Sequence, residues 1–242
     1  MIYLDAEYCD LRKIADSGQC FRWHNAANNI WEIPAFERVL TAQISGNDVV
    51  LDCSEDDFRE VWSSYFDNDS NYSEYHSAIL GAELPYLTAA AVTAKGIRIL
   101  RQDLWEITVS FIISQCNNIP RIKQCLNRII ERFGHFPKPF EITRGSLEGL
   151  GLGYRDEYIY DAAEKFSGAM TDFRAINGVG AKVNSCIQLY GLGRKDAFPR
   201  DTWIKRVERE QFGGRFPEEL FAGFAGVAQQ YLFYHARNLS GK

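Results

Sequence analysis

The sequence contains no Cys-x-x-Cys pair, no long apolar run and no low-complexity stretch. Its six cysteines are scattered between Cys9 and Cys186, and no cysteine follows Cys186. This spacing excludes a four-cysteine iron–sulfur loop near the C-terminus and favours reduced thiols over a disulfide framework. The apolar runs fall far short of the roughly 20 residues that a membrane-spanning helix needs, so we expect no membrane partner. The first residues lack the basic and apolar segments of a signal peptide, so none is expected.

The composition is otherwise that of a globular protein, with 46% apolar and 24% charged residues in a chain of 242. The charge is unevenly distributed. Residues 1–90 contain 5 Lys and Arg against 16 Asp and Glu, whereas residues 91–242 contain 22 against 16. An overall pI of about 5.5 therefore hides a basic C-terminal part, whose field would attract phosphate groups. On charge alone, an asymmetry that only aids solubility is an equally good interpretation.

The first part of the chain predicts β-strands. Runs rich in β-branched and aromatic residues, separated by turn-rich sequence, occur at 20–24, 30–36, 38–45 and 48–54. They indicate a small antiparallel sheet. Ser54, which is followed by three acidic residues, is typical of a helix N-cap.

From about residue 83 the spacing of apolar residues becomes helical. Helices are expected over 118–134, 155–166, 181–191, 202–212 and 223–239. We therefore predict an α+β fold in two domains. An N-terminal α+β domain with an antiparallel sheet covers residues 1–90, and a mainly α-helical domain covers residues 91–242.

The most informative segment is the tight turn Asn177-Gly178-Val179-Gly180 between two predicted helices. Its two glycines permit positive φ and leave backbone N–H groups uncovered at a helix N-terminus, where the helix dipole favours an anion. Such a turn can hold a DNA phosphate without reading sequence. Short motifs of this kind often occur by chance. The alternative interpretation is that the two glycines only end one helix and begin the next.

Lys182 lies in the first turn of the following predicted helix, where a cation opposes the helix dipole. This environment favours the neutral amine, which is a nucleophile that can form a Schiff base. The commoner role of such a lysine is to contact phosphate as a point charge. Asp201 is placed to cap the helix that begins at Thr202, and a carboxylate there can also stabilise developing positive charge. One short connection joins the two helices, so Lys182 and Asp201 can converge.

Six segments occur in a recognisable order: DSGQCFRW at 16–23, GIRILRQD at 96–103, FIISQCNNIPR at 111–121, LGLGYR at 150–155, the glycine turn with Lys182 followed by Pro199-x-Asp201, and GVAQQYLF at 226–233. Together they resemble the 8-oxoguanine DNA glycosylase/AP lyase branch of the helix–hairpin–helix DNA glycosylase superfamily. The resemblance runs from about residue 12 to residue 237. The resemblance implies that the helical domain is a helix–hairpin–helix glycosylase domain.

The resemblance also implies the reaction. Members of this branch excise an oxidised purine that has been flipped out of the DNA stack, and we expect excision of 8-oxoguanine, preferably opposite cytosine. Lys182 matches the catalytic lysine, which displaces the base, forms a Schiff base with the sugar and nicks the strand by β-elimination. Asp201 matches the aspartate that stabilises the transition state and orients the lysine. This chemistry requires no metal and no organic cofactor.

For the lesion-base pocket, the resemblance assigns Gly18, Phe111, Cys186, Gln229 and Phe233. The carbonyl of Gly18 would accept the N7–H that 8-oxoguanine has and guanine lacks, a contact suited to discrimination because a mismatch buries unpaired polar groups. Gln229 would bond the Watson–Crick edge, and Phe233 and Cys186 would sandwich the base. Without the resemblance, Phe233 and Cys186 would be interpreted as core residues.

Further residues are assigned to the DNA and to the orphaned base: Asn117, Asn118, Arg121, Tyr154, Arg155, Gly178, Gly180 and Trp203. Arg121 and Arg155 would read the orphaned cytosine, since a fork of guanidinium donors suits its acceptor edge. A phosphate contact is the alternative for both. Tyr154 would wedge beside the orphaned base.

Three positions depart from the family pattern. Cys116 replaces the first asparagine of the family's turn, which weakens one expected contact to the orphaned cytosine. Trp203 replaces a common histidine, and Asn177 replaces the usual hairpin proline. The short chain suggests a prokaryotic member, so we expect a monomer that acts on double-stranded DNA containing oxidised guanine in the cytoplasm, associated with the nucleoid.

Two alternatives remain open. One is a helix–hairpin–helix glycosylase for another damaged base, although the missing iron–sulfur loop and the presence of Lys182 argue against three other branches. The second is a non-enzymatic DNA-binding module, which would bind DNA in a salt-sensitive manner without a covalent intermediate. The pairing of Lys182 with Asp201 would then have no explanation.

Overall fold

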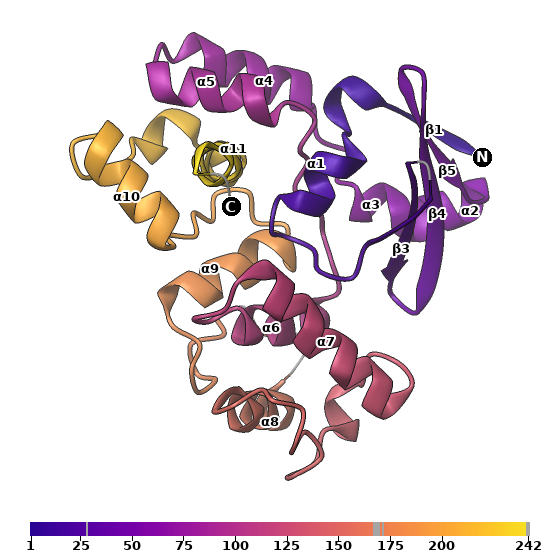
Figure 1. Cartoon of the computed structure of the whole chain (residues 1–242). Helices are drawn as coiled ribbons and strands as arrows, with labels where there is room; N and C mark the ends of the chain where they lie inside the picture. Colours follow the sequence, from indigo (N-terminus) through magenta and orange to yellow (C-terminus); the bar gives the residue numbers. More distant parts are fainter. Residues whose placement is uncertain (28, 167–169, 171, 241–242) are drawn as a thin grey trace.

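The computed structural model describes residues 1–242 except 28, 167–169, 171 and 241–242. Its N-terminal part contains an antiparallel sheet with the strand order β1-β5-β4-β3-β2 (Figure 1). The strands are β1 (Ile2–Asp5), β2 (His24–Ala27), β3 (Ile30–Ala35), β4 (Arg38–Ser45) and β5 (Asp48–Asp52). The predicted small antiparallel sheet and the α+β fold class are confirmed.

One face of the sheet is buried, and the alternation of side chains along β4 sets its register. Leu40 pairs with Ile33 of β3, and Ala42 pairs with Leu51 of β5. All four side chains are buried, because residues two apart on a strand point to the same face. Three short helical segments pack against this face: α1 (Leu11–Asp16), η2 (Phe58–Trp62) and α3 (Ser63–Tyr65). The short helix α2 (Glu55–Asp57) directly precedes η2 and buries none of its residues.

The predicted strand over 20–24 is wrong for residues 20–23, because β2 begins only at His24. Phe21 packs in the helical core, where its ring centroid lies 5.8 Å from that of Phe111. Trp23 packs instead in the core beneath the sheet, and its indole N–H donates to the hydroxyl of Tyr65. The two aromatic side chains enter different cores, so this segment crosses from one core to the other. It brings Gly18 to the rim of the site described below.

The rest of the chain is mainly helical. Its longer helices are α4 (Tyr72–Gly81), α5 (Pro85–Ala94), α6 (Leu104–Ile113), α7 (Ile119–Phe133), α8 (Arg155–Lys165), α9 (Ala181–Tyr190), α10 (Thr202–Gln211) and α11 (Ala225–Leu239). Three short turns of helix complete the chain: η1 (Ala6–Tyr8), η3 (Pro139–Glu141) and η4 (Glu218–Phe221). In the described part of the chain, no helix is long and apolar enough to cross a bilayer.

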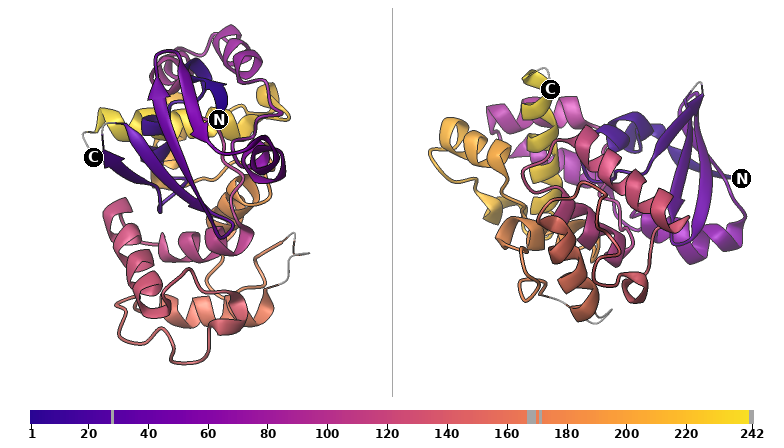
Figure 2. Two further views of the ribbon diagram at one scale, coloured as in Figure 1. Left: turned by 90° about the vertical axis from the view of Figure 1, so that its right-hand side faces the viewer. Right: turned by 60° about the horizontal axis from the view of Figure 1, so that its bottom comes forward.

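Helix α11 is the centre of this arrangement, and it packs against α5 and α10 (Figure 1). The turned views in Figure 2 show α6, α7 and α8 grouped at the opposite end, with α9 between the two groups. Helix α9 packs on α6. The end of α6, the start of α9 and the start of α10 are thereby brought around one region next to α11.

The predicted helices agree with the structure to within two residues at each end. Asn118 caps α7, as predicted, with its side chain accepting a hydrogen bond from the amide of Arg121 at 2.9 Å. Gly134 ends the helix in the left-handed region with φ of 77°. Ser54 accepts from the amide of Asp57 at 3.0 Å, which confirms it as an N-cap.

A buried carboxylate connects distant segments of the chain. Asp67, 1% exposed, accepts hydrogen bonds from Arg101 at 2.6 Å, from Lys195 at 3.1 Å and from the hydroxyl of Tyr72 at 2.9 Å. The carbonyl of Lys195 in turn accepts from the amide of Gly226 in α11. These bonds fix the connection before α10 relative to the turn that follows α3. The division of the chain into domains at residue 90 stays a prediction.

Candidate functional site

A pocket of about 840 Å³ lies where α6, α9, α10 and α11 meet the loop that precedes β2. Ten of the predicted site residues line it: Gly18, Phe111, Asn117, Asn118, Lys182, Cys186, Asp201, Trp203, Gln229 and Phe233. Arg121, Tyr154, Arg155, Gly178 and Gly180 lie outside it. The pocket is large enough for a nucleotide-sized ligand. Among the described residues, no three His, Cys, Asp or Glu side chains converge as a metal site.

Lys182 projects into this pocket from the first turn of α9. Its Nζ lies 3.3 Å from the hydroxyl oxygen of Ser114 and 4.9 Å from the centroid of the Phe111 ring. Phe111 lies in the last turn of α6, and Ser114 directly follows that helix. Within the described chain Lys182 forms no ion pair with Asp201, so its amine is not neutralised by a carboxylate contact.

Asp201 lines the same pocket as the N-cap of α10, and its carboxylate accepts a hydrogen bond from the amide of Ile204 at 2.8 Å. Burial raises the pKa of Asp201, because desolvation disfavours the charged form. The amide of Ile204 and the charge of Lys182 act in the opposite direction. The predicted cap is confirmed, and the two predicted reactive side chains share one pocket.

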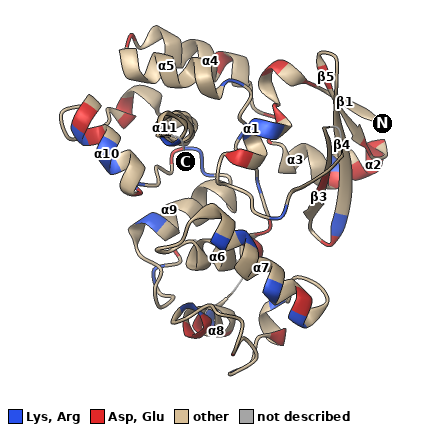
Figure 3. Ribbon diagram, viewed as in Figure 1, with Lys and Arg blue, Asp and Glu red and all other residues tan. Residues whose placement is uncertain are grey.

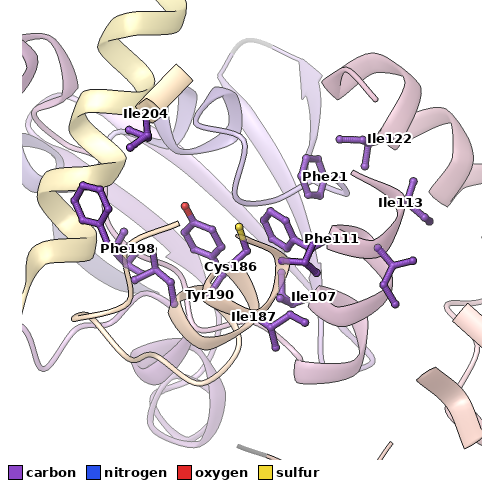
Figure 4. Packing of buried hydrophobic residues seen from close by; sticks show 14 of the residues in the cluster. Phe21, Ile107, Phe111, Ile113, Ile122, Cys186, Ile187, Tyr190, Phe198 and Ile204 are labelled. Atoms are coloured by element: carbon purple, nitrogen blue, oxygen red, sulfur yellow. The ribbon is translucent and has the colours of Figure 1, made fainter. Parts of the chain in front are cut away.

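The wall beside Lys182 is apolar. Phe111 stacks on Tyr190, with ring centroids 5.5 Å apart, and Cys186 lies beside them (Figure 4). Burial raises the pKa of the Cys186 thiol to about 11, so this group is neutral at physiological pH. A neutral sulfur next to aromatic rings forms a surface on which a planar base can stack.

On the other side, Gly18 lies against Phe233. A Cβ atom on Gly18 would approach the Phe233 ring to 3.1 Å, and Gly18 has φ of +77°, so both space and backbone favour glycine here. Phe233 is only partly buried although it lies on the central helix α11. Its ring is therefore available at the pocket wall.

Gln229 presents a free acceptor in the pocket wall. Its side-chain amide donates to the carbonyl of Pro199 at 3.1 Å, whereas its Oε1 is buried without a hydrogen-bond partner among the described residues. A buried unpaired oxygen costs free energy unless a ligand supplies a donor. The environment of Gln229 thus fits recognition of a donor group.

The asparagine turn after α6 is fastened to the 150–155 loop. Asn117 donates to the carbonyl of Ile113 at 2.8 Å. Arg155 donates from Nε to the carbonyl of Gln115 at 3.0 Å, and Arg121 donates to the carbonyl of Gly151 at 2.8 Å. Both guanidinium groups donate here to neutral backbone carbonyls. Figure 3 shows Lys and Arg along α7, which carries Arg121, and at the start of α9.

Tyr154 stands on this loop as an exposed aromatic side chain, 51% accessible. The guanidinium carbon of Arg155 lies 4.4 Å from its ring centroid, which restrains the ring. Trp203 lines the pocket at the start of α10, and the guanidinium carbon of Arg206 lies 4.8 Å from its ring. Tyr154 is therefore accessible to a nucleic-acid partner, whereas Trp203 is partly buried and contributes to the pocket wall.

The two hairpin glycines differ in their surroundings. Gly178 has φ of +79°, and a Cβ atom there would lie 2.2 Å from the ring of Tyr158. Gly180, the N-cap of α9, has extended backbone with nothing within 4 Å of a Cβ position. Gly178 is therefore required by internal packing, whereas Gly180 leaves the amides of the α9 N-terminus open to a ligand.

Sequence reasoning did not single out several residues that line the pocket, including Asp16, Phe21, Ser114, Tyr190 and Arg237. Phe21 and Tyr190 carry no signal beyond that of core aromatic residues. Arg237 lies one helical turn after Phe233, and this spacing could have indicated that it shares a face with the pocket residues. Ser114 is conspicuous only in three dimensions.

Comparison with known proteins places these features in context. A family model for the N-terminal domain of 8-oxoguanine DNA glycosylases matches residues 1–108. An N-glycosylase/DNA lyase from Saccharomyces cerevisiae is 26% identical, over 86% of this chain and 69% of its own length.

Two solved structures are similar over almost the whole chain. MBOgg1, in complex with a low-affinity DNA ligand, is 34% identical, with 99% of this chain and 96% of that chain covered and a TM-score of 0.89. The 8-oxoguanine glycosylase/lyase of Clostridium acetobutylicum, in complex with double-stranded DNA containing cytosine opposite 8-oxoguanine, is 33% identical. The match covers 97% of this chain and 93% of that one, with a TM-score of 0.87.

Proposed function

The chain belongs to the 8-oxoguanine DNA glycosylase/lyase branch of the helix–hairpin–helix glycosylases, and we propose that Lys182 and Asp201 carry out its reaction in the pocket described above. The protein is a bifunctional DNA N-glycosylase and DNA lyase of base-excision repair. The observation that carries the proposal is the shared pocket. Within the described part of the chain, the amine that lines it has no ion-pair partner and contacts the hydroxyl of Ser114, and the buried Oε1 of Gln229 has no hydrogen-bond partner. The carboxylate that lines it has a raised pKa.

Base excision begins with a flipped nucleotide in the pocket, because the glycosidic carbon is inaccessible within a duplex. The neutral amine of Lys182 attacks C1′ as the bond from C1′ to N9 of the base breaks, and the base leaves with a proton. Positive charge develops on the sugar in this step, and the carboxylate of Asp201 stabilises it. Partial burial strengthens this interaction, because less solvent screens the two charges.

Strand cleavage follows on the same lysine. The sugar ring opens to a Schiff base between C1′ and Nζ, loses a proton from C2′ and expels the 3′ phosphate by β-elimination. Hydrolysis of the imine then returns Lys182. Removal of the lysine would leave a pocket that binds the lesion but forms no covalent intermediate.

Two polar groups recognise the edges of the oxidised base, and two side chains contact its faces. The carbonyl of Gly18 accepts the N7–H of 8-oxoguanine, and the buried Oε1 of Gln229 accepts a donor from its Watson–Crick edge. Phe233 and Cys186 contact the faces of the base, and Phe111 supports the wall below Lys182. Guanine lacks the N7–H, so its N7 lone pair would oppose the Gly18 carbonyl.

The DNA around the lesion would contact the surface outside the pocket. Tyr154 inserts beside the orphaned base. Arg121 and Arg155 release the backbone carbonyls to which they donate in the free protein and donate instead to the acceptor edge of cytosine. Asn117 and Asn118 enter the duplex. The backbone at Gly178 and Gly180 and the indole N–H of Trp203 contact phosphates.

We further propose that the protein acts as a monomer in the cytoplasm of a prokaryotic cell, associated with the nucleoid. The similarity to a relative from Clostridium acetobutylicum supports a prokaryotic source. DNA is the partner in the structures of both solved relatives.

Borohydride trapping tests the proposal. The wild-type protein and Lys182→Gln are incubated with a duplex that contains one 8-oxoguanine opposite cytosine, and with an undamaged duplex. We expect a covalent band for the wild type on the lesion duplex alone and none for Lys182→Gln. A persistent band in the variant would remove Lys182 as the nucleophile. Tight lesion binding with no band for the wild type would indicate a monofunctional enzyme, and released base on a gel would identify it.

A further inference from the structure

Ser114 is a second polar group at the reactive lysine. It directly follows α6, and its amide donates to the carbonyl of Ser110 at 2.9 Å. Its hydroxyl donates to the carbonyl of Phe111 at 2.8 Å. The single hydroxyl proton is therefore committed to the backbone, and the oxygen lone pairs remain as an acceptor that faces the pocket.

That acceptor lies 3.3 Å from Nζ of Lys182. The Cys186 thiol on the same helix as Lys182 is a second side-chain partner of the amine. Lys182 starts from the N-terminus of α9, where the helix dipole opposes a cation. Its side chain extends to the C-terminal end of α6, where the dipole of that helix favours one. A hydrogen-bond acceptor and a helix C-terminus are both groups that favour a cation.

We propose that Ser114 is a positioning residue for Lys182, which holds Nζ at the pocket wall and sets the pH at which the amine becomes nucleophilic. This inference rests on the proposed role of Lys182 as the nucleophile. Ser114 keeps its own proton throughout, and the proton that Lys182 loses before attack passes to water. The serine forms no covalent bond.

Other groups also act on the lysine, and the test must separate them from Ser114. Among the titratable groups that line the pocket, Cys186 and Tyr190 lie on its own helix, Asp201 at the start of α10 and Cys116 after α6. The other charged residues that line the pocket are Asp16, Arg200, Lys205 and Arg237. Substitution of Ser114 leaves all of these groups in place. A change in the pH profile can then be assigned to the lost hydroxyl.

The experiment measures the rate of borohydride-trapped adduct as a function of pH, with excess enzyme and a duplex that contains a preformed abasic site. This substrate isolates Schiff-base formation from base release. For Ser114→Ala we expect the midpoint of the acidic limb to move to lower pH by about 0.5–1 unit, because the acceptor that favours the ammonium is lost. The plateau rate should fall about 3- to 10-fold, because Nζ is no longer held in place.

Two variants serve as controls. Ser114→Thr keeps a hydroxyl and should restore the wild-type midpoint. Ser110→Ala removes a hydroxyl one turn earlier in α6, from a buried residue outside the pocket, and should leave both midpoint and plateau unchanged. Thermal unfolding of each variant checks that it is folded, and if Ser114→Ala does not fold, Ser114→Gly removes the same hydroxyl.

A wild-type profile in Ser114→Ala would overturn the inference, as would an equal loss of rate at every pH, which would mark a purely structural role. Failure of the proposed function has a different signature. The wild-type protein itself would then form no trapped adduct with the abasic duplex.

Discussion

Gly178 lies directly over the ring of Tyr158, and a Cβ atom at this glycine would come within 2.2 Å of Cδ2 and 2.4 Å of Cε2 of that ring. Gly178 also has φ of +79°. Two residues later, Gly180 has extended backbone and an open Cβ position. The packing of the fold therefore requires glycine at position 178. At position 180 the absence of a side chain matters only for access of a ligand to the backbone.

This contrast predicts opposite effects of the same substitution. Gly178→Ser should lower the free energy of unfolding by about 2–3 kcal/mol, from backbone strain and the clash with Tyr158. Gly180→Ser should leave it unchanged or raised, because serine is a preferred N-cap. Its hydroxyl would compete for the α9 amides and weaken DNA binding by about 0.5–1.5 kcal/mol. Denaturant unfolding and binding titrations check both; equal DNA affinity of Gly180→Ser and the wild type would remove this hairpin from the interface.

The raised pKa of Asp201 predicts that the free energy of unfolding depends on pH. Its folded-state pKa is raised above the ordinary 3.8, so over this window the folded protein binds more protons than the unfolded chain. The free energy of unfolding of the wild type should therefore fall as pH rises from 3.8 through the folded-state pKa. Asp201→Asn should lack this fall while keeping the cap, since Asn and Asp are equally good N-caps. Unfolding curves at several pH values measure the difference; a constant difference between the two proteins would contradict the shift.

Asp201→Asn should also slow base excision by about 10²-fold or more, because the neutral amide cannot stabilise the positive charge on the sugar. In the wild type the acidic limb of base excision should lie at higher pH than for an exposed aspartate. Single-turnover release of 8-oxoguanine measures both effects, and a melting curve of the variant controls for folding.

We expect Phe233 to contribute to DNA affinity only when the damaged base is present in the duplex. In a Lys182→Gln background, which prevents turnover, Phe233→Ala should weaken binding of an 8-oxoguanine duplex by about 1–3 kcal/mol through loss of stacking. Binding of a duplex with a stable abasic analogue should be unaffected, since no base is present to stack. Equal losses on both duplexes would return Phe233 to a structural role.

Cys116 is a strained position in the turn after α6. It is exposed and has φ of +52°, a region that asparagine tolerates better than cysteine. Cys116→Asn should raise the free energy of unfolding by about 0.5–1 kcal/mol. It should also increase the preference for cytosine opposite the lesion, since an amide is added beside the orphaned base. Excision rates opposite each of the four bases measure this preference, and no change would separate the turn from opposite-base selection.

Much of the fold followed from local physics. Neighbouring residues determine the alternation along a strand, the side-chain acceptor of a helix cap and the positive φ of a helix end. The sequence therefore predicted the strands β3 to β5, the caps Asn118 and Asp201 and the left-handed Gly134. The strand predicted at 20–23 was wrong for the opposite reason. Phe21 and Trp23 look like one face of a strand in sequence, but they enter two separate cores.

The same division applies to the site. The sequence by itself determined which residue types are present for the chemistry: an amine at a helix start, a carboxylate at another and a glycine turn between helices. Only the tertiary structure decided their neighbours. The contact between Lys182 and Ser114 joins positions 68 residues apart in the chain, and the free acceptor of Gln229 depends on the carbonyl of Pro199. Such contacts depend on how α6, α9 and α11 pack, and no local pattern encodes a packing geometry that side chains from the whole chain determine together.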